Sequence, residues 1–120
     1  MNTPKIFDSE YRFACIVWEH EPIMMRELIQ LCADNLGWKR TTTYTVLKRL
    51  IERGIMSSND SVVTSLISKE EIQRHESKDF IERTFDGSLP KFIAAFTDNK
   101  SLTADEIEEI KHMIENYKEE

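Results

Sequence analysis

Apolar residues in the first half of the chain recur with helical spacing and predict three helices. The first covers residues 9–20 and ends before Pro22, and its apolar stripe consists of Tyr11, Ala14, Cys15 and Trp18. The second covers residues 24–35 and the third covers residues 40–53. Gly37 and Gly54 follow the last turns of these two helices, as is typical of helix C-caps.

The third predicted helix has two unlike faces. Val46, Leu47, Leu50 and Ile51 fall on one side, with Thr43 one turn earlier, where they can enter a core. The opposite side carries hydroxyl groups in its first turns and cations further along, namely Thr41, Thr45, Lys48, Arg49 and Glu52, with Tyr44 on the flank. Threonine is a poor helix former, so its frequency here indicates a purpose beyond helix formation.

The pattern after residue 54 predicts a hairpin and then three more helices. Residues 55–58 and 61–67 flank an Asn59-Asp60 turn, and the second stretch is rich in residues that favour strands. Capping boxes begin at Ser68 and Thr103 and mark the starts of two helices, with a short helix over residues 89–96 between them. The last helix has apolar residues at coiled-coil spacing, which need a partner surface: Ile107, Ile110, Ile114 and Tyr117.

The charge of the chain is distributed unevenly. The net charge is −6, but residues 1–60 contain eight basic and eight acidic residues, whereas residues 61–120 contain eight and fourteen. Within residues 38–54 Glu52 is the one acidic residue, and the basic residues are Lys39, Arg40, Lys48, Arg49 and Arg53. Phosphate contacts depend on local charge, so the acidic total does not exclude a nucleic-acid partner.

Three helices followed by a hairpin is the element order of a winged helix-turn-helix, in which the third helix enters the major groove of DNA. Threonine side chains can bond to base edges, and Lys and Arg bind phosphate. We therefore expect base-facing roles for Thr41, Thr42, Tyr44 and Thr45. Phosphate contacts are expected from Lys39, Arg40, Lys48, Arg49 and Arg53.

One recognition helix reads too few base pairs for useful specificity, so the sequence predicts a homodimer on two-fold symmetric DNA. The expected interface residues are Phe80, Phe85, Ile107, Ile110, Ile114 and Tyr117. An alternative is a stripe that packs only within its own chain. A second alternative is a winged helix that binds proteins and no longer binds DNA, which the acidic balance favours and the basic third helix opposes.

The stretch from Gly37 to Gly54 resembles the recognition segment of the penicillinase-repressor family, which includes methicillin-resistance and copper-responsive repressors. The helix around Val17-Trp18, the segment Phe80–Leu89 and the segment 101–114 are similar to further parts of that family in the same order. The resemblance covers nearly the whole chain.

The resemblance implies a mainly α fold, with a winged helix over residues 1–68 and a helical dimerisation module over residues 69–120. It implies a repressor that binds a roughly palindromic operator as a homodimer. It also implies that Trp38, Leu47 and Leu50 pack in the core, while Thr42, Thr45 and Arg49 face DNA.

The chain departs from the family pattern in three places. The wing tip, residues 57–61, lacks the usual basic residue and glycine, and Asp60 would repel phosphate. No cysteine follows Cys32, so the copper site of some members is absent. Antibiotic-responsive members are cleaved between Asn and Phe, where this chain has Ala95-Phe96. The inducer or inactivating protease is therefore not identified by the sequence.

Other function classes lack their signatures. His20, His75 and His112 stand in no metal-ligand spacing, and there is no phosphate loop or nucleophile elbow. We expect no enzyme activity, no metal and no cofactor. Cys15 and Cys32 read as buried thiols rather than as a disulfide. With no membrane-spanning apolar run and no signal-peptide pattern, the expected location is the cytoplasm, without a membrane partner.

Overall fold

The computed structural model describes residues 4–98 and 101–118, and it divides into two compact units, Met1–Ser77 and Lys78–Glu120. The division falls inside one helix, α4 (Lys69–Phe85). The predicted functional boundary at residue 68 stays a prediction.

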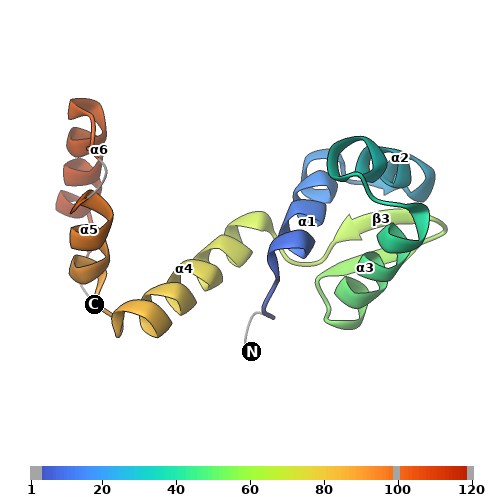
Figure 1. Cartoon of the computed structure of the whole chain (residues 1–120), viewed down its shortest axis with the longest axis horizontal. Helices are drawn as coiled ribbons and strands as arrows, with labels where there is room; N and C mark the ends of the chain where they lie inside the picture. The colour runs from blue at the N-terminus through green and yellow to red at the C-terminus, as the bar shows by residue number, and fades with distance from the viewer. Residues whose placement is uncertain (1–3, 99–100, 119–120) are drawn as a thin grey trace. The chain divides into compact units, whose positions relative to one another are not determined.

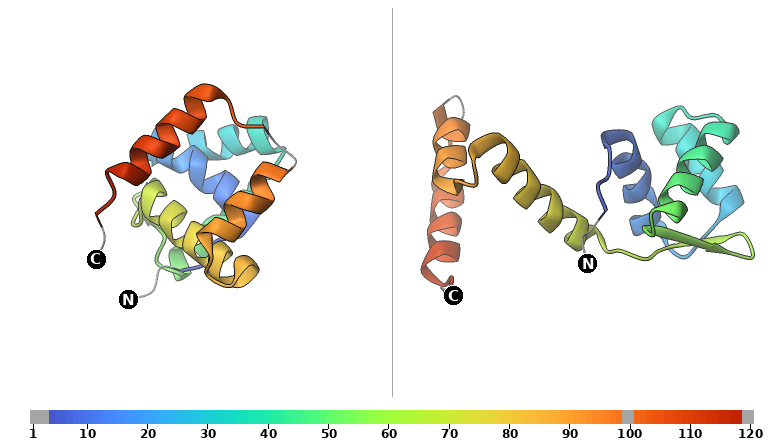
Figure 2. Two further views of the ribbon diagram at one scale, coloured as in Figure 1. Left: turned by 90° about the vertical axis from the view of Figure 1, so that its left-hand side faces the viewer. Right: turned by 90° about the horizontal axis from the view of Figure 1, so that it is seen from below.

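The first unit contains three helices and a small sheet, in the predicted order (Figure 1). The elements that precede α4 are α1 (Asp8–His20), β1 (Ile23–Met24), α2 (Met25–Leu36), α3 (Arg40–Glu52), β2 (Met56–Asn59) and β3 (Val62–Ser65). The three helix bounds lie within one residue of the predicted ones. The hairpin of β2 and β3 runs beside α3 (Figure 1 and Figure 2). The predicted mainly helical fold with an N-terminal winged helix is therefore confirmed.

The sheet differs from the prediction in two details. It has three antiparallel strands in the order β1-β3-β2, and β1 pairs Ile23 with Val63. Two residues are too few to show a strand period, so β1 left no signal in the sequence. The hairpin turn lies one residue later than predicted, because Asp60 and Ser61 have the left-handed φ values of 51° and 63°.

The core of the first unit lies between the three helices and the sheet. Phe13, Leu28 and Leu50 are fully buried, one from each helix, and Met56 and Val63 are their counterparts from the hairpin. Val46, Leu47 and Leu50 of α3 are buried as predicted, whereas the stripe predicted for α1 is offset. Ala14 is buried, but Tyr11, Cys15 and Trp18 are half-buried, and Phe13, Ile16 and Val17 take the core positions. The Trp38 ring stacks on Phe13 with a centroid distance of 5.9 Å, so Trp38 packs against the core as the resemblance implied.

The start of α4 belongs to the first unit. Ile72, in its first turns, is 1% exposed and joins the core. The Ser68 hydroxyl accepts a hydrogen bond from the Glu71 N–H at 3.1 Å, as the predicted capping box requires. The Trp18 indole N–H donates to the Ile67 carbonyl at 3.1 Å and holds the segment before α4 against α1.

The second unit consists of the end of α4, then α5 (Leu89–Asp98) and α6 (Ala104–Glu115) (Figure 2). The second predicted capping box is complete: the Thr103 hydroxyl accepts from the Glu106 N–H at 3.1 Å, and the Glu106 carboxylate accepts from the Thr103 N–H at 2.9 Å. Because α6 ends at Glu115, Tyr117 lies beyond the helix whose stripe it was expected to continue.

Four phenylalanine rings form a continuous cluster in the second unit. Phe92 is its centre, with ring centroids 5.5 to 6.0 Å away, and the other members are Phe80, Phe85 and Phe96. Among the residues described in this unit none is buried. In the described part of the chain no helix is both long enough and apolar enough to cross a membrane.

Candidate nucleic-acid interface

The outer face of α3 carries the predicted DNA contacts. Gly37, at a left-handed φ of 68°, ends α2 and allows the chain to turn into α3. The apolar side of α3 is buried, and Thr43 is buried with it. The exposed residues from Lys39 to Glu52 are Lys39, Arg40, Thr41, Thr42, Tyr44, Thr45, Lys48, Arg49, Ile51 and Glu52. Ile51 was expected on the apolar side but is 39% exposed. The helical turn thus brings the predicted hydroxyl and basic side chains onto one surface.

The Thr45 hydroxyl already has a donor role. It donates to the Thr41 carbonyl at 2.9 Å, one turn earlier in α3. This bond leaves the oxygen lone pairs and the methyl group facing solvent, so Thr45 can accept a hydrogen bond or make an apolar contact.

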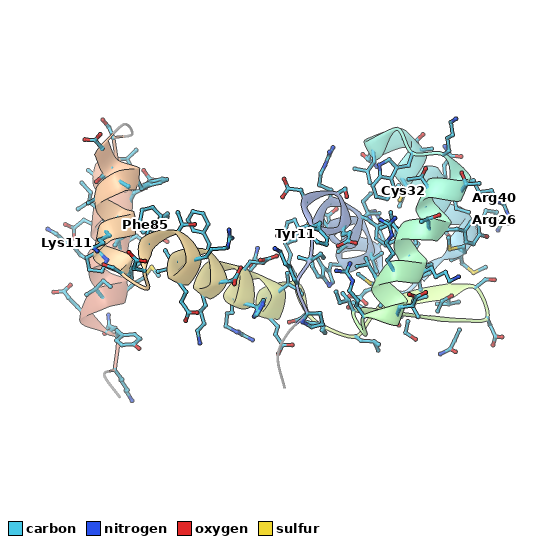
Figure 3. All side chains as sticks on the ribbon, turned by 60° about the horizontal axis from the view of Figure 1, so that its bottom comes forward. Tyr11, Arg26, Cys32, Arg40, Phe85 and Lys111 are labelled. Carbon is cyan, nitrogen blue, oxygen red and sulfur yellow. The ribbon has the colours of Figure 1, made fainter. Side chains whose placement is uncertain are left out.

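An open depression of about 450 Å³ lies between α2, α3 and the tip of the hairpin. Arg26 and Gln30 from α2 and Arg40 and Tyr44 from α3 line it, and the Arg40 guanidinium lies 5.6 Å from the centroid of the Tyr44 ring. Figure 3 shows Arg26 and Arg40 at the same edge of the unit. Sequence reasoning missed Arg26, whose signal was a cation in the first turn of the helix before the recognition helix.

The wing is short and fixed at its tip. The Met25 N–H donates to the Ser61 carbonyl at 2.7 Å and ties the hairpin turn to the start of α2. Asp60 is exposed in this turn, and residues 56–65 contain no Lys or Arg. The wing therefore adds negative charge beside the basic face of α3.

Arg53 differs from the other predicted phosphate contacts. Its guanidinium forms an ion pair with Glu10 at 2.5 Å and also donates to the Lys5 carbonyl at 2.8 Å. The Arg53 side chain is 29% exposed and the Glu10 side chain only 4%. The structure thus gives Arg53 intramolecular partners that the sequence pattern did not reveal.

The second unit exposes large apolar side chains. Of the six predicted interface residues, Phe85 is half-buried and the others are 40% to 70% exposed: Phe80, Ile107, Ile110, Ile114 and Tyr117. Sequence reasoning missed Leu89, Ile93 and Phe96 of α5, which are exposed to a similar degree. Their spacing of three to four residues was the available signal, because it places all three on one face of a short helix.

Both cysteines are free, Cys15 half-buried and Cys32 buried. Burial raises the pKa of the Cys32 thiol to about 11, although a hydrogen bond with Thr43 opposes the rise. No cluster of three or more His, Cys, Asp or Glu side chains suited to a metal ion occurs among the residues described.

These elements define a winged helix-turn-helix protein with a basic, hydroxyl-rich third helix. A family model described as penicillinase repressor matches residues 6–116, and the chain belongs to that family. The penicillinase repressor of Bacillus licheniformis is 28% identical over 119 residues, which cover 96% of this chain and 93% of the relative.

Two further comparisons agree with this family. The methicillin resistance regulatory protein MecI of Staphylococcus aureus (strain Mu50 / ATCC 700699) is 25% identical over 116 residues, covering 93% of this chain and 94% of MecI. A solution structure of the monomeric form of Bacillus licheniformis BlaI in complex with the blaP half-operator has a TM-score of 0.52 and 28% identity. The match covers 57% of this chain and 88% of that one.

Proposed function

We propose that this protein is a DNA-binding transcriptional repressor that acts as a homodimer on a roughly palindromic operator. The observation that carries the proposal is the outer face of α3, where threonine and basic side chains are exposed together on a winged helix. Membership of the penicillinase repressor family supports it. So does the similar BlaI structure, which was solved with a half-operator.

We assign the residues of α3 to two tasks. Thr41, Thr42, Tyr44 and Thr45 lie in its first half and face bases, because the start of a recognition helix is the part that reaches base edges. The phosphate contacts are Lys39, Arg40, Lys48 and Arg49, to which we add Arg26 of α2. Arg53 receives a different assignment below.

The homodimer is supported by the second unit. Its six predicted interface residues are exposed or half-buried, and an apolar surface of this kind is stable when another copy covers it. Two-fold symmetry places one recognition helix on each half of the operator. Each protomer alone would read one half, as the monomeric BlaI form does in its complex with a half-operator.

We assign release from the operator to an unidentified inducer or inactivating protease. The step Ala95-Phe96 lies inside α5, and both residues are exposed. A protease acts on extended backbone, so cleavage at this step would need local unfolding of α5. Cleavage there would separate α6 from the rest of the chain and remove four of the six predicted interface residues.

The competing function is a winged helix that binds a protein partner. The acidic wing and the net charge of −6 favour it, whereas the basic face of α3 favours DNA. The two differ in salt dependence, because DNA binding releases counterions and weakens steeply with salt. An apolar protein contact does not weaken in this way.

The test is selection from random duplex DNA with the purified full chain, followed by titration of the selected duplex at several salt concentrations. We expect a two-fold symmetric site whose log affinity falls linearly with log salt concentration. Enrichment of no sequence by a folded dimer would contradict the proposal and favour the protein-binding alternative.

A further inference from the structure

Glu10 is a buried acidic residue of the first unit. It lies in the first turn of α1 and is 3% exposed, one helical turn before the core residues Phe13 and Ala14. Burying a carboxylate is unfavourable unless the charge is paired and its oxygens are hydrogen-bonded. The partners of the Glu10 carboxylate therefore indicate what this buried charge does.

Both oxygens of the Glu10 carboxylate are engaged. One accepts a hydrogen bond from the Phe7 N–H at 2.9 Å, and the other pairs with Arg53. Arg53 follows the last turn of α3, and its guanidinium also reaches the Lys5 carbonyl and lies 5.8 Å from the centroid of the Phe7 ring. One ion pair thus joins the segment before α1, α1 itself and the end of α3.

The protonation of Glu10 fits this arrangement. Burial raises the pKa of its carboxyl group, but the hydrogen bonds from Arg53 and the Phe7 N–H, together with the charges of Arg53 and Arg49, outweigh burial and hold the pKa below its ordinary value. Glu10 is therefore ionised at neutral pH, and its negative charge compensates the positive charge of the Arg53 guanidinium.

We propose that Glu10 and Arg53 are positioning residues that hold α3 against α1 and thereby set the ratio of specific to non-specific DNA affinity, without a phosphate contact from Arg53. The inference rests on the proposed DNA binding. To reach a phosphate, Arg53 would leave a buried carboxylate without its partner, which costs more than an exposed charge pair gains. Base contacts depend on the helix position to within a fraction of an ångström, whereas flexible Lys and Arg side chains tolerate larger shifts.

The decisive variant is Arg53→Gln, with Arg49→Gln as the matched control one turn earlier on α3. The affinities of the full-length dimer for the selected duplex and for a scrambled duplex are measured over a salt series. Arg53→Gln is expected to lower the ratio of these affinities about tenfold, the effect typical of one mismatched base pair. We define the salt slope as the slope of log affinity against log salt concentration. Arg53→Gln leaves this slope unchanged, whereas Arg49→Gln reduces its magnitude by about 0.9 for each phosphate contact that is lost. A reduced slope in Arg53→Gln, or an unchanged ratio, would overturn the inference.

A double-mutant cycle tests whether the two residues act as a pair. Glu10→Gln is expected to lower the same ratio, and the double variant Glu10→Gln/Arg53→Gln to lose no more than the larger single effect. Losses that add would show that the two residues act independently, which contradicts the inference. Arg53→Lys keeps the charge and is expected to restore part of the ratio.

Two controls separate this inference from other failures. Thermal unfolding followed by circular dichroism reports whether each variant is folded, and if Glu10→Gln is not, the salt slopes of Arg53→Gln and Arg53→Lys still decide. Absence of salt-dependent binding by the unmodified protein would refute the proposed function itself. Normal binding by the unmodified protein, with a changed slope in Arg53→Gln, would refute only the positioning role.

Discussion

The two units of the chain differ in how they bury apolar side chains. The first has a core of sixteen buried hydrophobic residues, from Ile6 to Ile72. The second carries phenylalanine, isoleucine and leucine at comparable density, yet none of its described residues is buried. Helical periodicity alone therefore does not show whether an apolar stripe packs within its own chain.

The difference indicates how each unit gains stability. In the first unit the apolar faces of the helices pack against each other and against the sheet, so this unit can fold as a single copy. The second has helices with good local signals, such as the complete capping box at Thr103, but too little burial to offset the entropy of ordering them. We infer that the stability of the second unit depends on association, which the following predictions test.

The largest effect is expected from charges placed on the apolar side of α6. Ile110→Asp with Ile114→Asp should convert the dimer to a monomer whose first unit stays folded, because both side chains would be buried in the proposed interface. Loss of the linked second recognition helix is expected to weaken binding to the full operator roughly 10²- to 10⁴-fold. Sedimentation velocity and a gel-shift titration measure the two effects.

Lys111→Asp is the matched control for that variant. It changes the net charge by the same amount on the same helix, at an exposed position whose contact is a weak ion pair of 3.9 Å with Glu108. We expect it to remain dimeric. A dimeric Ile110→Asp/Ile114→Asp variant, or a monomeric Lys111→Asp variant, would show that the interface is assigned wrongly.

The second prediction compares a core residue of the first unit with an exposed apolar residue of the second. Leu50→Ala should destabilise the first unit by about 2–5 kcal/mol, because Leu50 is fully buried. This loss is expected to be the same at every protein concentration. The loss caused by Ile107→Ala should depend on concentration, since a dimer contact stabilises by mass action. Chemical denaturation at two concentrations a hundredfold apart distinguishes them, and two concentration-independent losses would contradict the comparison.

The sequence predicted the first unit well because its core and its periodicity have the same cause. Residues that face a core within the chain must recur every three to four positions, and Val46, Leu47 and Leu50 of α3 could be read directly. In α1 residues 13–18 are all apolar, so the period could not fix which side is buried, and the predicted stripe was offset. The exposed side of α3 could be read for the same reason, as what remains when the apolar side is buried.

The missed features depend on tertiary contacts. Arg53 was assigned with the other cations because charge alone says nothing of the Glu10 carboxylate, which is distant in sequence and meets it only in the fold. Strand β1 has two residues, and its pairing with β3 is set by packing and not by pattern. Arg26 became a candidate only when α2 and α3 brought it beside Arg40.

The third prediction concerns cations of the two units. Arg49→Ala should weaken binding to the operator and to a scrambled duplex about equally and reduce the salt slope by about one. Arg83→Ala, in the second unit, removes an exposed cation with a 3.6 Å ion pair to Asp79 and is expected to change neither quantity. Equal losses in the two variants would mean that the salt dependence reports net charge and not contacts from α3.

The smallest effect concerns the two thiols and tests whether the first unit is independent of the dimer. In Cys15→Ser the remaining thiol is Cys32, which is buried and, at a pKa of about 11, has a thiolate fraction on the order of 10⁻⁴ at pH 7. A thiol-reactive reagent should therefore label it only when the first unit opens. If that unit folds by itself, adding Ile110→Asp and Ile114→Asp leaves the labelling rate unchanged. Markedly faster labelling of Cys32 in the monomeric variant would mean that association also stabilises the winged helix. The two units would then differ only in how strongly their stability depends on association.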